Sequence, residues 1–240
     1  MAIQFDFSDK VVLVTGVARI GQIGQAVASA FGLAGAKLVA ADRNAVAVAE
    51  RVKEFKAQGI DARPAAGDLT EADIAELAVE TAIKNFGRLD ILVNVAGGLT
   101  TQGSLGSIKP EDFDRELAIN LKTTYLMSRA SLPRLIQSRG CIVNFASAAV
   151  LNPGVDLSVY SAAKAAVAGF TRSLAAELQS QRVRVNAIAP NMVRTTENVA
   201  SAGDSANYIE MVDIVNAVMF LASDAARAIS GHVLSVTNGS

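Results

Sequence analysis

A tyrosine and a lysine four residues apart, Tyr160 and Lys164, are the residues of this chain best suited to acid–base chemistry. At i and i+4 of a helix the two side chains lie on one face, about 5–6 Å apart at Cβ. A nearby ammonium favours the phenolate and lowers the tyrosine pKa from about 10, which makes Tyr160 a usable proton donor or acceptor near neutral pH. Taken alone the pair is a weak signal, because surface helices carry such pairs often.

A glycine-rich segment between Thr15 and Gly24 follows the first apolar run and could bind a phosphate group. Glycines let the backbone turn tightly and approach a phosphate closely. The helix expected after the segment offers free N–H groups and a positive dipole end to a pyrophosphate. A P-loop is excluded, because Gln22 and Ile23 stand where a lysine and a hydroxyl are required. The alternative is an ordinary strand-to-helix turn.

Acidic residues follow two of the later apolar runs. Asp42 ends the second run, where a carboxylate can accept hydrogen bonds from the adenosine ribose and repel a 2′-phosphate, so NAD is favoured over NADP. Arg43 is the counter-argument, because a guanidinium could bind that phosphate. Asp68 could reach the adenine edge, and capping the helix that begins near Thr70 explains it equally well.

Short apolar runs alternate with helical patterns, and these elements must position the residues above. Most runs are nearly continuously apolar, as in strands covered by helices on both faces. The alternation predicts one α/β domain over residues 1–240 with a doubly wound, seven-stranded parallel sheet, and ligands bind beyond the carboxyl ends of such strands. The expected strands are Val11–Thr15, Lys37–Ala41, Ala62–Ala66, Asp90–Asn94, Cys141–Phe145, Val183–Ala189 and Val233–Val236. The expected helices are Gly24–Leu33, Ala45–Gln58, Glu71–Phe86, Pro110–Gln137, Val159–Gln179 and Tyr208–Ala222.

Composition excludes several classes of function. The chain has 240 residues with 51% hydrophobic and 19% charged, and 22 basic against 23 acidic residues give no electrostatic case for binding nucleic acid or an anionic membrane. One cysteine, Cys141, and one histidine, His232, argue against a disulfide and against a side-chain metal site. The first ten residues hold no apolar run and no clear 18-residue apolar span follows, so we expect a cytosolic protein.

Together these motifs resemble the short-chain dehydrogenase/reductase family in its short, single-domain form. The resemblance runs from about Asp9 to Gly239 and implies a Rossmann-like fold and an oxidoreductase that uses a nicotinamide dinucleotide. Ser147 ends a strand 13 residues before Tyr160, and Asn120 lies inside the long helix 110–137, as in the family. The motifs that carry the resemblance are Thr15-Gly16…Gly24, Asn94-Val95-Ala96-Gly97, Asn120, Ser147, Tyr160-x3-Lys164 and Pro190…Thr195.

The resemblance implies a role for each of four catalytic residues. Tyr160 would give a proton to the substrate carbonyl, or take one from the alcohol in reverse. Ser147 would hydrogen-bond the same oxygen. Lys164 would hold the nicotinamide ribose hydroxyls and lower the Tyr160 pKa. Asn120 would anchor a water that links Lys164 to solvent, and no metal is needed.

The resemblance also assigns cofactor contacts to segments at the carboxyl edge of the sheet. The chain from Asn94 to Gly97 would line the cofactor cleft, and Val193 and Thr195 would meet the nicotinamide carboxamide. The implied cofactor-binding residues are Gly16, Arg19, Gly21, Ile23, Gly24, Asp42, Arg43, Asp68, Leu69, Asn94, Ala96, Gly97, Tyr160, Lys164, Pro190, Val193 and Thr195.

The chain departs from the family pattern at three places, one of which is Asn191 in place of the usual glycine after Pro190. The glycine turn is two residues longer than the usual T-G-x3-G-x-G, with Gln22 at its middle glycine, which could move Arg19 toward the adenosine side. Thr237-Asn238 replace the usual acidic-glycine pair near the C-terminus. Enoyl reductases of the family also have a longer glycine segment, but they space tyrosine and lysine six or seven residues apart, so the spacing of four here favours ketone and alcohol chemistry.

Substrate and assembly follow from the remaining residues. The region 195–210 would form a short substrate lid, and it is polar and free of Lys or Arg up to about Asn207. Apolar residues after Ser147 favour a neutral carbonyl or secondary alcohol, because a polyanionic substrate normally requires basic side chains. Small residues along Val159–Gln179, together with the resemblance, predict a homotetramer. Two alternatives remain open, an NADP-dependent 3-oxoacyl-(acyl-carrier-protein) reductase and a non-catalytic nucleotide-binding regulator.

Overall fold

A computed structural model describes residues 5–238, whose strands form a seven-stranded parallel sheet in the order β3-β2-β1-β4-β5-β6-β7. The strand order reverses between β1 and β4, which opens a crevice for ligands at the carboxyl ends of these strands. The predicted doubly wound fold is confirmed, because every expected strand is present within about one residue of its expected bounds. The strands are β1 Val11–Thr15, β2 Lys37–Asp42, β3 Ala62–Ala66, β4 Ile91–Asn94, β5 Cys141–Phe145, β6 Arg184–Pro190 and β7 Val233–Val236.

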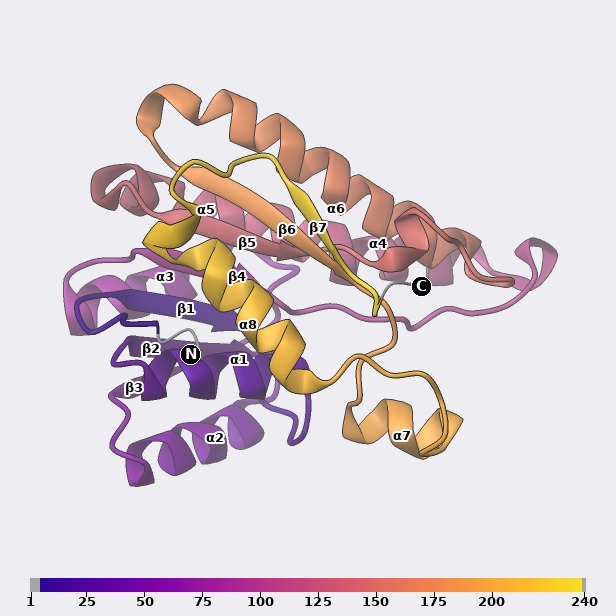
Figure 1. Cartoon of the computed structure of the whole chain (residues 1–240), viewed down its shortest axis with the longest axis horizontal. Helices are drawn as coiled ribbons and strands as arrows, with labels where there is room; N and C mark the ends of the chain where they lie inside the picture. The colour runs from indigo at the N-terminus through magenta and orange to yellow at the C-terminus, as the bar shows by residue number, and fades with distance from the viewer. Residues whose placement is uncertain (1–4, 239–240) are drawn as a thin grey trace.

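Helices cover both faces of the sheet. Figure 1 shows α1, α2 and α8 along one face, with α3, α5 and α6 on the other, and two separate clusters of buried side chains correspond to these two layers. Buried strands between two helical layers explain the continuous apolar runs of the sequence. The helices are α1 Ile23–Leu33, α2 Ala45–Ala57, α3 Ala72–Phe86, α4 Pro110–Leu117, α5 Thr123–Ser138, α6 Ser158–Glu177, α7 Thr196–Ala202 and α8 Met211–Ala222.

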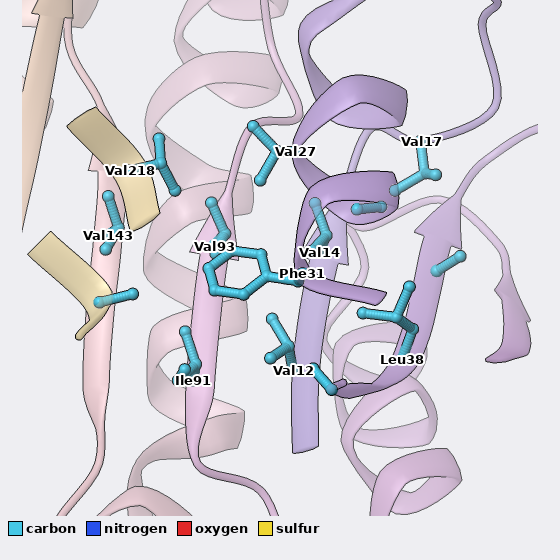
Figure 2. Packing of buried hydrophobic residues seen from close by; sticks show 14 of the residues in the cluster. Val12, Val14, Val17, Val27, Phe31, Leu38, Ile91, Val93, Val143 and Val218 are labelled. Carbon is cyan, nitrogen blue, oxygen red and sulfur yellow. The ribbon is translucent and has the colours of Figure 1, made fainter. Parts of the chain in front are cut away.

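The packing of α1 on the sheet sets the position of the glycine turn. Figure 2 shows the Phe31 ring of α1 lying over Val12 and Val14 of β1 and Val93 of β4, and all four side chains are fully buried. Burying a phenylalanine side chain contributes about 1.5–3 kcal/mol to folding. This contact holds the start of α1 beyond the carboxyl end of β1, where the glycine-rich segment joins the two elements.

The structure corrects the sequence-based elements at three places. The single helix expected over 110–137 is interrupted by a π-helical turn at Ala118–Lys122, which separates α4 from α5. A short helix, α7, lies in the region expected to be a polar lid. The last long helix begins at Met211 and not at Tyr208, because Ile209 forms a β-bridge with Val193. None of the helices in residues 5–238 combines the length and the apolar character that a membrane crossing requires.

Candidate functional site

Three of the predicted catalytic side chains meet at the carboxyl end of β5. Ser147 follows β5 by two residues, and α6 brings Tyr160 and Lys164 to the same place from its first two turns. The Ser147 hydroxyl acts on the Tyr160 phenol and lowers its pKa, so the two groups are neighbours, and the Lys164 Nζ lies 5.9 Å from the centroid of the Tyr160 ring. The Lys164 ammonium donates a 2.9 Å hydrogen bond to the carbonyl of Phe145, the last residue of β5. A hydroxyl from the chain after β5 and a phenol and an amine from α6 therefore form one cluster.

Burial controls the ionisation of this cluster. It raises the pKa of Tyr160 above its ordinary value, although the hydrogen bond with Ser147 works in the opposite direction and the Glu116 carboxylate adds to the rise. Burial also lowers the pKa of Lys164 to about 8, while Glu116 opposes that change. The expected lowering of the Tyr160 pKa is therefore wrong for this arrangement, because the loss of solvation outweighs the lowering effect of Ser147.

Asn120, the fourth predicted residue, lies in the π-helical turn and is buried. Its side-chain amide is paired with the backbone of Gly98: the Nδ2 donates to the Gly98 carbonyl and the Oδ1 accepts from the Gly98 N–H, both at 3.0 Å. The Asn120 carbonyl accepts a 2.8 Å hydrogen bond from the Thr124 hydroxyl. A π-turn adds one residue to a helical turn, so it changes the direction in which Asn120 faces relative to a regular helix.

Glu116 is a buried carboxylate at this site that the sequence analysis missed. Its Oε1 accepts a 3.0 Å hydrogen bond from the Asn120 amide, and its Oε2 accepts from the backbone N–H and the hydroxyl of Thr100. It lies four residues before Asn120, and that spacing on a helix was the signal that could have revealed it.

The glycine turn is shaped to approach a bound group closely. An added Cβ on Gly24 would overlap the carbonyl oxygen of Gly16, so the start of α1 packs directly on the end of β1. No side chain caps the N-terminus of α1, which begins at Ile23 after Gln22. Uncapped N–H groups at a helix N-terminus behind a glycine turn fit a pyrophosphate.

The two extra residues of the turn extend toward α7. The Arg19 guanidinium pairs with the Glu197 carboxylate at 2.5 Å, and the Gly21 carbonyl accepts from the Thr196 N–H at 3.2 Å. The Gly21 N–H donates to the Gln25 side chain at 2.7 Å, which ties the turn to α1. The insertion therefore directs Arg19 to the segment after β6 and not to the adenosine side.

Asp42 and Asp68 lie at the carboxyl ends of neighbouring strands with partners of their own. The Asp42 carboxylate accepts from the Ala18 N–H at 3.0 Å and from the Asn44 N–H at 3.1 Å, which joins the end of β2 to the glycine turn. Asp68 accepts from the N–H and hydroxyl of Thr70, and these bonds lower its pKa. Asp68 therefore closes a turn before α3 and does not cap that helix as expected, because the N-cap of α3 is Glu71. Arg43, which follows Asp42, has an exposed side chain, whereas Leu69, which follows Asp68, is buried.

The segment after β4 joins the glycine turn to the catalytic cluster. Ala96 donates its N–H to the Thr15 hydroxyl at 2.9 Å and lies directly against Gly16, while Gly97 lies against the Asn120 side chain with a positive φ of +134°. The buried Asn94 amide donates to Asn144 of β5 at 2.9 Å, so its side chain joins two strands.

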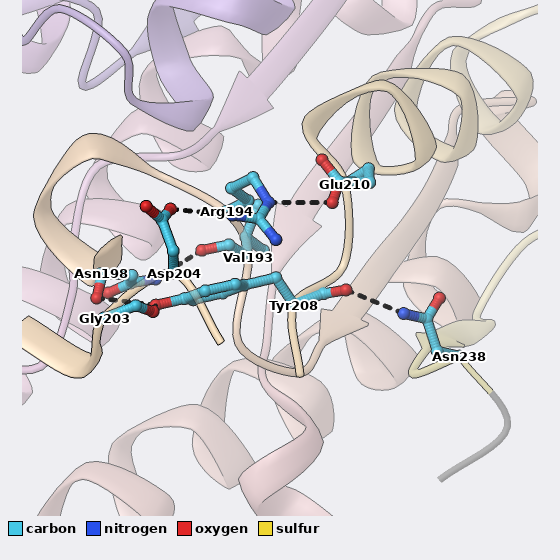
Figure 3. A network of polar contacts seen from close by, with 8 residues as sticks. All are labelled: Val193, Arg194, Asn198, Gly203, Asp204, Tyr208, Glu210 and Asn238. Carbon is cyan, nitrogen blue, oxygen red and sulfur yellow. Dashed lines mark hydrogen bonds and ion pairs between the residues drawn. The ribbon is translucent and has the colours of Figure 1, made fainter. Parts of the chain in front are cut away.

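The segment after β6 is held by its own polar network, which Figure 3 shows. The Arg194 guanidinium stacks 4.7 Å from the Tyr208 ring centroid and pairs with Glu210 and Asp204. The Tyr208 hydroxyl lies 2.7 Å from the Gly203 carbonyl, and the Asn238 amide donates to the Tyr208 carbonyl at 2.9 Å. Asn238, one of the residues that depart from the family pattern, therefore anchors this segment.

Three predicted cofactor residues begin the same segment. Pro190 ends β6, Val193 is buried in the β-bridge with Ile209, and the Thr195 hydroxyl accepts from the Asn198 N–H at 3.1 Å as the N-cap of α7. The Thr195 hydroxyl therefore already has a partner within the chain.

Comparison with known proteins identifies the relatives of this chain. A family model described as short chain dehydrogenase matches residues 10–206. A D-threitol dehydrogenase of Mycolicibacterium smegmatis is 35% identical, with 100% of this chain and 96% of the relative covered. A 3-oxoacyl-[acyl-carrier-protein] reductase of Thermotoga maritima is 32% identical, with 96% and 97% covered.

A solved structure supports the same relationship. The 7α-hydroxysteroid dehydrogenase complexed with NADH and 7-oxo glycochenodeoxycholic acid superposes with a TM-score of 0.90 at 29% identity. The match covers 98% of this chain and 95% of that structure, so the similarity extends over the whole sheet and its helices.

Proposed function

The chain belongs to the short-chain dehydrogenase/reductase family, and from that premise we propose that it transfers a hydride between NAD(H) and a neutral carbonyl or secondary alcohol. The observation that carries this proposal is the convergence of Ser147, Tyr160 and Lys164 at the carboxyl end of β5, the same edge of the sheet at which the glycine turn and the segment after β4 lie. The nicotinamide, when bound, supplies the hydride, and the residues of the chain bind it, orient the substrate and move the proton.

Tyr160 acts as the acid in carbonyl reduction and as the base in alcohol oxidation. Its raised pKa keeps the phenol protonated near neutral pH, which suits the proton donor required for reduction. Ser147 acts on the phenol from the adjoining chain after β5, so both hydroxyls can point at one substrate oxygen and stabilise the negative charge that develops there.

Lys164 and Asn120 support the proton transfer from the interior side. Lys164 holds the ribose hydroxyls of the bound dinucleotide, and its pKa of about 8 allows it to exchange a proton near neutral pH. Asn120 anchors the water through which that proton reaches solvent.

The glycine turn binds the pyrophosphate through the N–H groups at the start of α1. We expect Gly24→Ala to lower the free energy of unfolding by about 1–3 kcal/mol, because the added methyl group meets a backbone carbonyl that cannot move freely. The same displacement weakens NADH binding, measured by the fluorescence of the bound dinucleotide. Gly106→Ala is the matched control, since its added Cβ meets open space, and equal NADH affinity in both variants would contradict the assignment.

Asp42 supports the preference for NAD, since its carboxylate stands where an adenosine 2′-phosphate would be repelled. We expect Asp42→Asn, which removes the charge at nearly constant shape, to lower the ratio of kcat/KM for NADH over NADPH about tenfold, or about 1.4 kcal/mol. Asp61→Asn, at the opposite end of the neighbouring strand, is the control and leaves the ratio unchanged. A wild-type preference for NADPH would exclude the role of Asp42 and favour Arg43.

A surface pocket that includes the first residue of α6 supports a substrate without negative charge. This pocket of about 370 Å³ lies between the chain after β4 and the chain before α6, and its lining holds no lysine or arginine among the described residues. Arg194 is a basic residue of the segment after β6, and its guanidinium is already paired with Glu210 and Asp204. The pocket is lined by Gly103, Leu105, Pro153, Gly154, Val155, Asp156 and Ser158.

A second candidate is an NADP-dependent 3-oxoacyl-(acyl-carrier-protein) reductase, favoured by the 32% identity to a reductase of that name. Initial rates with neutral ketones, secondary alcohols and 3-oxoacyl thioesters, each with NADH and NADPH, separate the two. The proposal expects turnover of neutral ketones with NADH. Turnover confined to 3-oxoacyl thioesters with NADPH would replace it with the second candidate.

The assembly and the lid complete the proposal. We propose that the segment 195–210 closes over the substrate and that four chains form a homotetramer. Exposed Phe113 of α4 and Tyr125 of α5, whose ring lies 6.3 Å from that of Phe170 of α6, support a subunit interface on these helices. The cytosolic location stays a prediction.

A further inference from the structure

Glu116 is a fully buried carboxylate that none of the proposed steps uses. Its relative exposure is 0%, and its two oxygens accept three hydrogen bonds from the Asn120 amide and from the N–H and hydroxyl of Thr100. An ionised carboxylate accepts hydrogen bonds without donating, so this set of donors suits it. Burying a charged carboxylate costs free energy because the group loses its hydration. A role at the neighbouring catalytic cluster would explain why the chain keeps such a group there.

We propose that Glu116 is a positioning residue of the catalytic centre: its carboxylate holds the Asn120 amide and the chain at Thr100 in place and directs a negative charge toward Lys164. The inference rests on the proposed function and adds to it a residue that orients the others.

The hydrogen bonds show how Glu116 fixes the geometry. It connects α4 to the chain after β4 through Thr100, while Asn120 connects the π-helical turn to Gly98 of the same chain. The Asn120 amide also donates to the backbone carbonyl of Glu116 at 3.0 Å. The segment from Gly97 to Thr100 is thus held from one side by two residues of the same helical surface, and it lies next to the glycine turn that binds the dinucleotide.

The charge of Glu116 acts on the two titrating residues of the cluster. Within residues 5–238, the charged or titratable groups near Lys164 are Glu116 from α4 and Tyr160 from α6, and the Phe145 carbonyl of β5 completes its surroundings. Glu116 favours the protonated forms of both Lys164 and Tyr160. Replacing Glu116 by a neutral residue would therefore lower the pKa of both Lys164 and Tyr160. If Glu116 had only a structural role, the same replacement would leave both pKa values unchanged.

Titration of Lys164 by carbon-13 NMR of ε-labelled lysine tests this charge without substrate or cofactor. The Lys164 resonance is assigned by its loss in Lys164→Met, and we expect a midpoint of about 8 in the wild type. Glu116→Gln should move the midpoint to lower pH, whereas Glu116→Asp, which keeps the charge, and Glu111→Gln, an exposed site on α4, should not. A wild-type midpoint in Glu116→Gln would overturn the proposal.

Steady-state kinetics of the same variants test the positioning. Glu116→Asp cannot reach both Asn120 and Thr100, so we expect kcat to fall about ten- to a hundredfold in a chain that still folds. Unchanged turnover in Glu116→Asp would overturn the positioning role, even if Glu116→Gln did not fold. Absence of turnover in the wild type would instead refute the proposed function, and the titration would still decide whether Glu116 acts on Lys164.

Discussion

Tyr160→Phe is expected to lower turnover by about 10²–10⁴-fold while leaving NADH affinity nearly unchanged. The substitution removes one oxygen, the one that Ser147 contacts and that reaches the substrate, and it keeps the ring that packs near Lys164. The loss should appear in kcat and kcat/KM together, because the proton is needed only in the transition state. Stopped-flow rates with a reactive ketone and a separate NADH titration measure the two quantities.

Tyr125→Phe is the matched control for this experiment, since it removes an exposed phenol from α5 and should leave turnover unchanged. Wild-type turnover in Tyr160→Phe would remove the phenol from the mechanism. A parallel loss of NADH binding would mean that the ring, and not the proton, is what the site requires.

Lys164→Met is expected to lower turnover about a hundredfold or more and to raise the KM for NADH. The substitution removes the ammonium that holds the ribose and exchanges the proton, while an unbranched side chain of similar length fills the space. Lys53→Met on the exposed surface of α2 is the control. An unaltered KM for NADH in Lys164→Met would contradict the ribose contact.

The same variant carries a prediction for stability against pH. The pKa of Lys164 is lowered from 10.5 to about 8 in the folded chain, so between these two values the unfolded chain binds more protons. Stability rises with pH wherever the unfolded state binds more protons. The unfolding free energy of the wild type, relative to Lys164→Met, should therefore increase between pH 8 and 10.5 and stay constant below pH 7. Urea unfolding at several pH values measures this difference, and a flat difference would show that Lys164 titrates normally.

The strands and most of the helices could be predicted from the sequence because their signals are local. Continuous apolar runs such as Val11–Thr15 occur only where both faces of a strand are covered, and the helical patterns between them permit few other topologies. The pairing of Tyr160 with Lys164 is likewise a matter of spacing on one helix. Only the convergence of Ser147 with these residues depends on the fold, and there the family resemblance supplied the arrangement.

Features that depend on contacts between segments far apart in the chain could not be predicted from the sequence. The π-helical turn at Asn120 is made of residues common in ordinary helices, with no glycine or proline among them, so it has no local signature. The pairing of Arg19 with Glu197 joins segments 178 residues apart. The raised pKa of Tyr160 arises from burial, which spacing alone does not reveal, and the full burial of Glu116 is likewise known only from the fold.

The most direct test of hydride transfer at this site uses NADH that carries deuterium on the nicotinamide ring. The wild type should place that deuterium on the carbinol carbon of the alcohol formed from a neutral ketone, as seen by mass spectrometry, and Tyr160→Phe should form almost none. Tight NADH binding without labelled alcohol from any ketone would contradict the account and indicate a nucleotide-binding protein that does not catalyse the reaction.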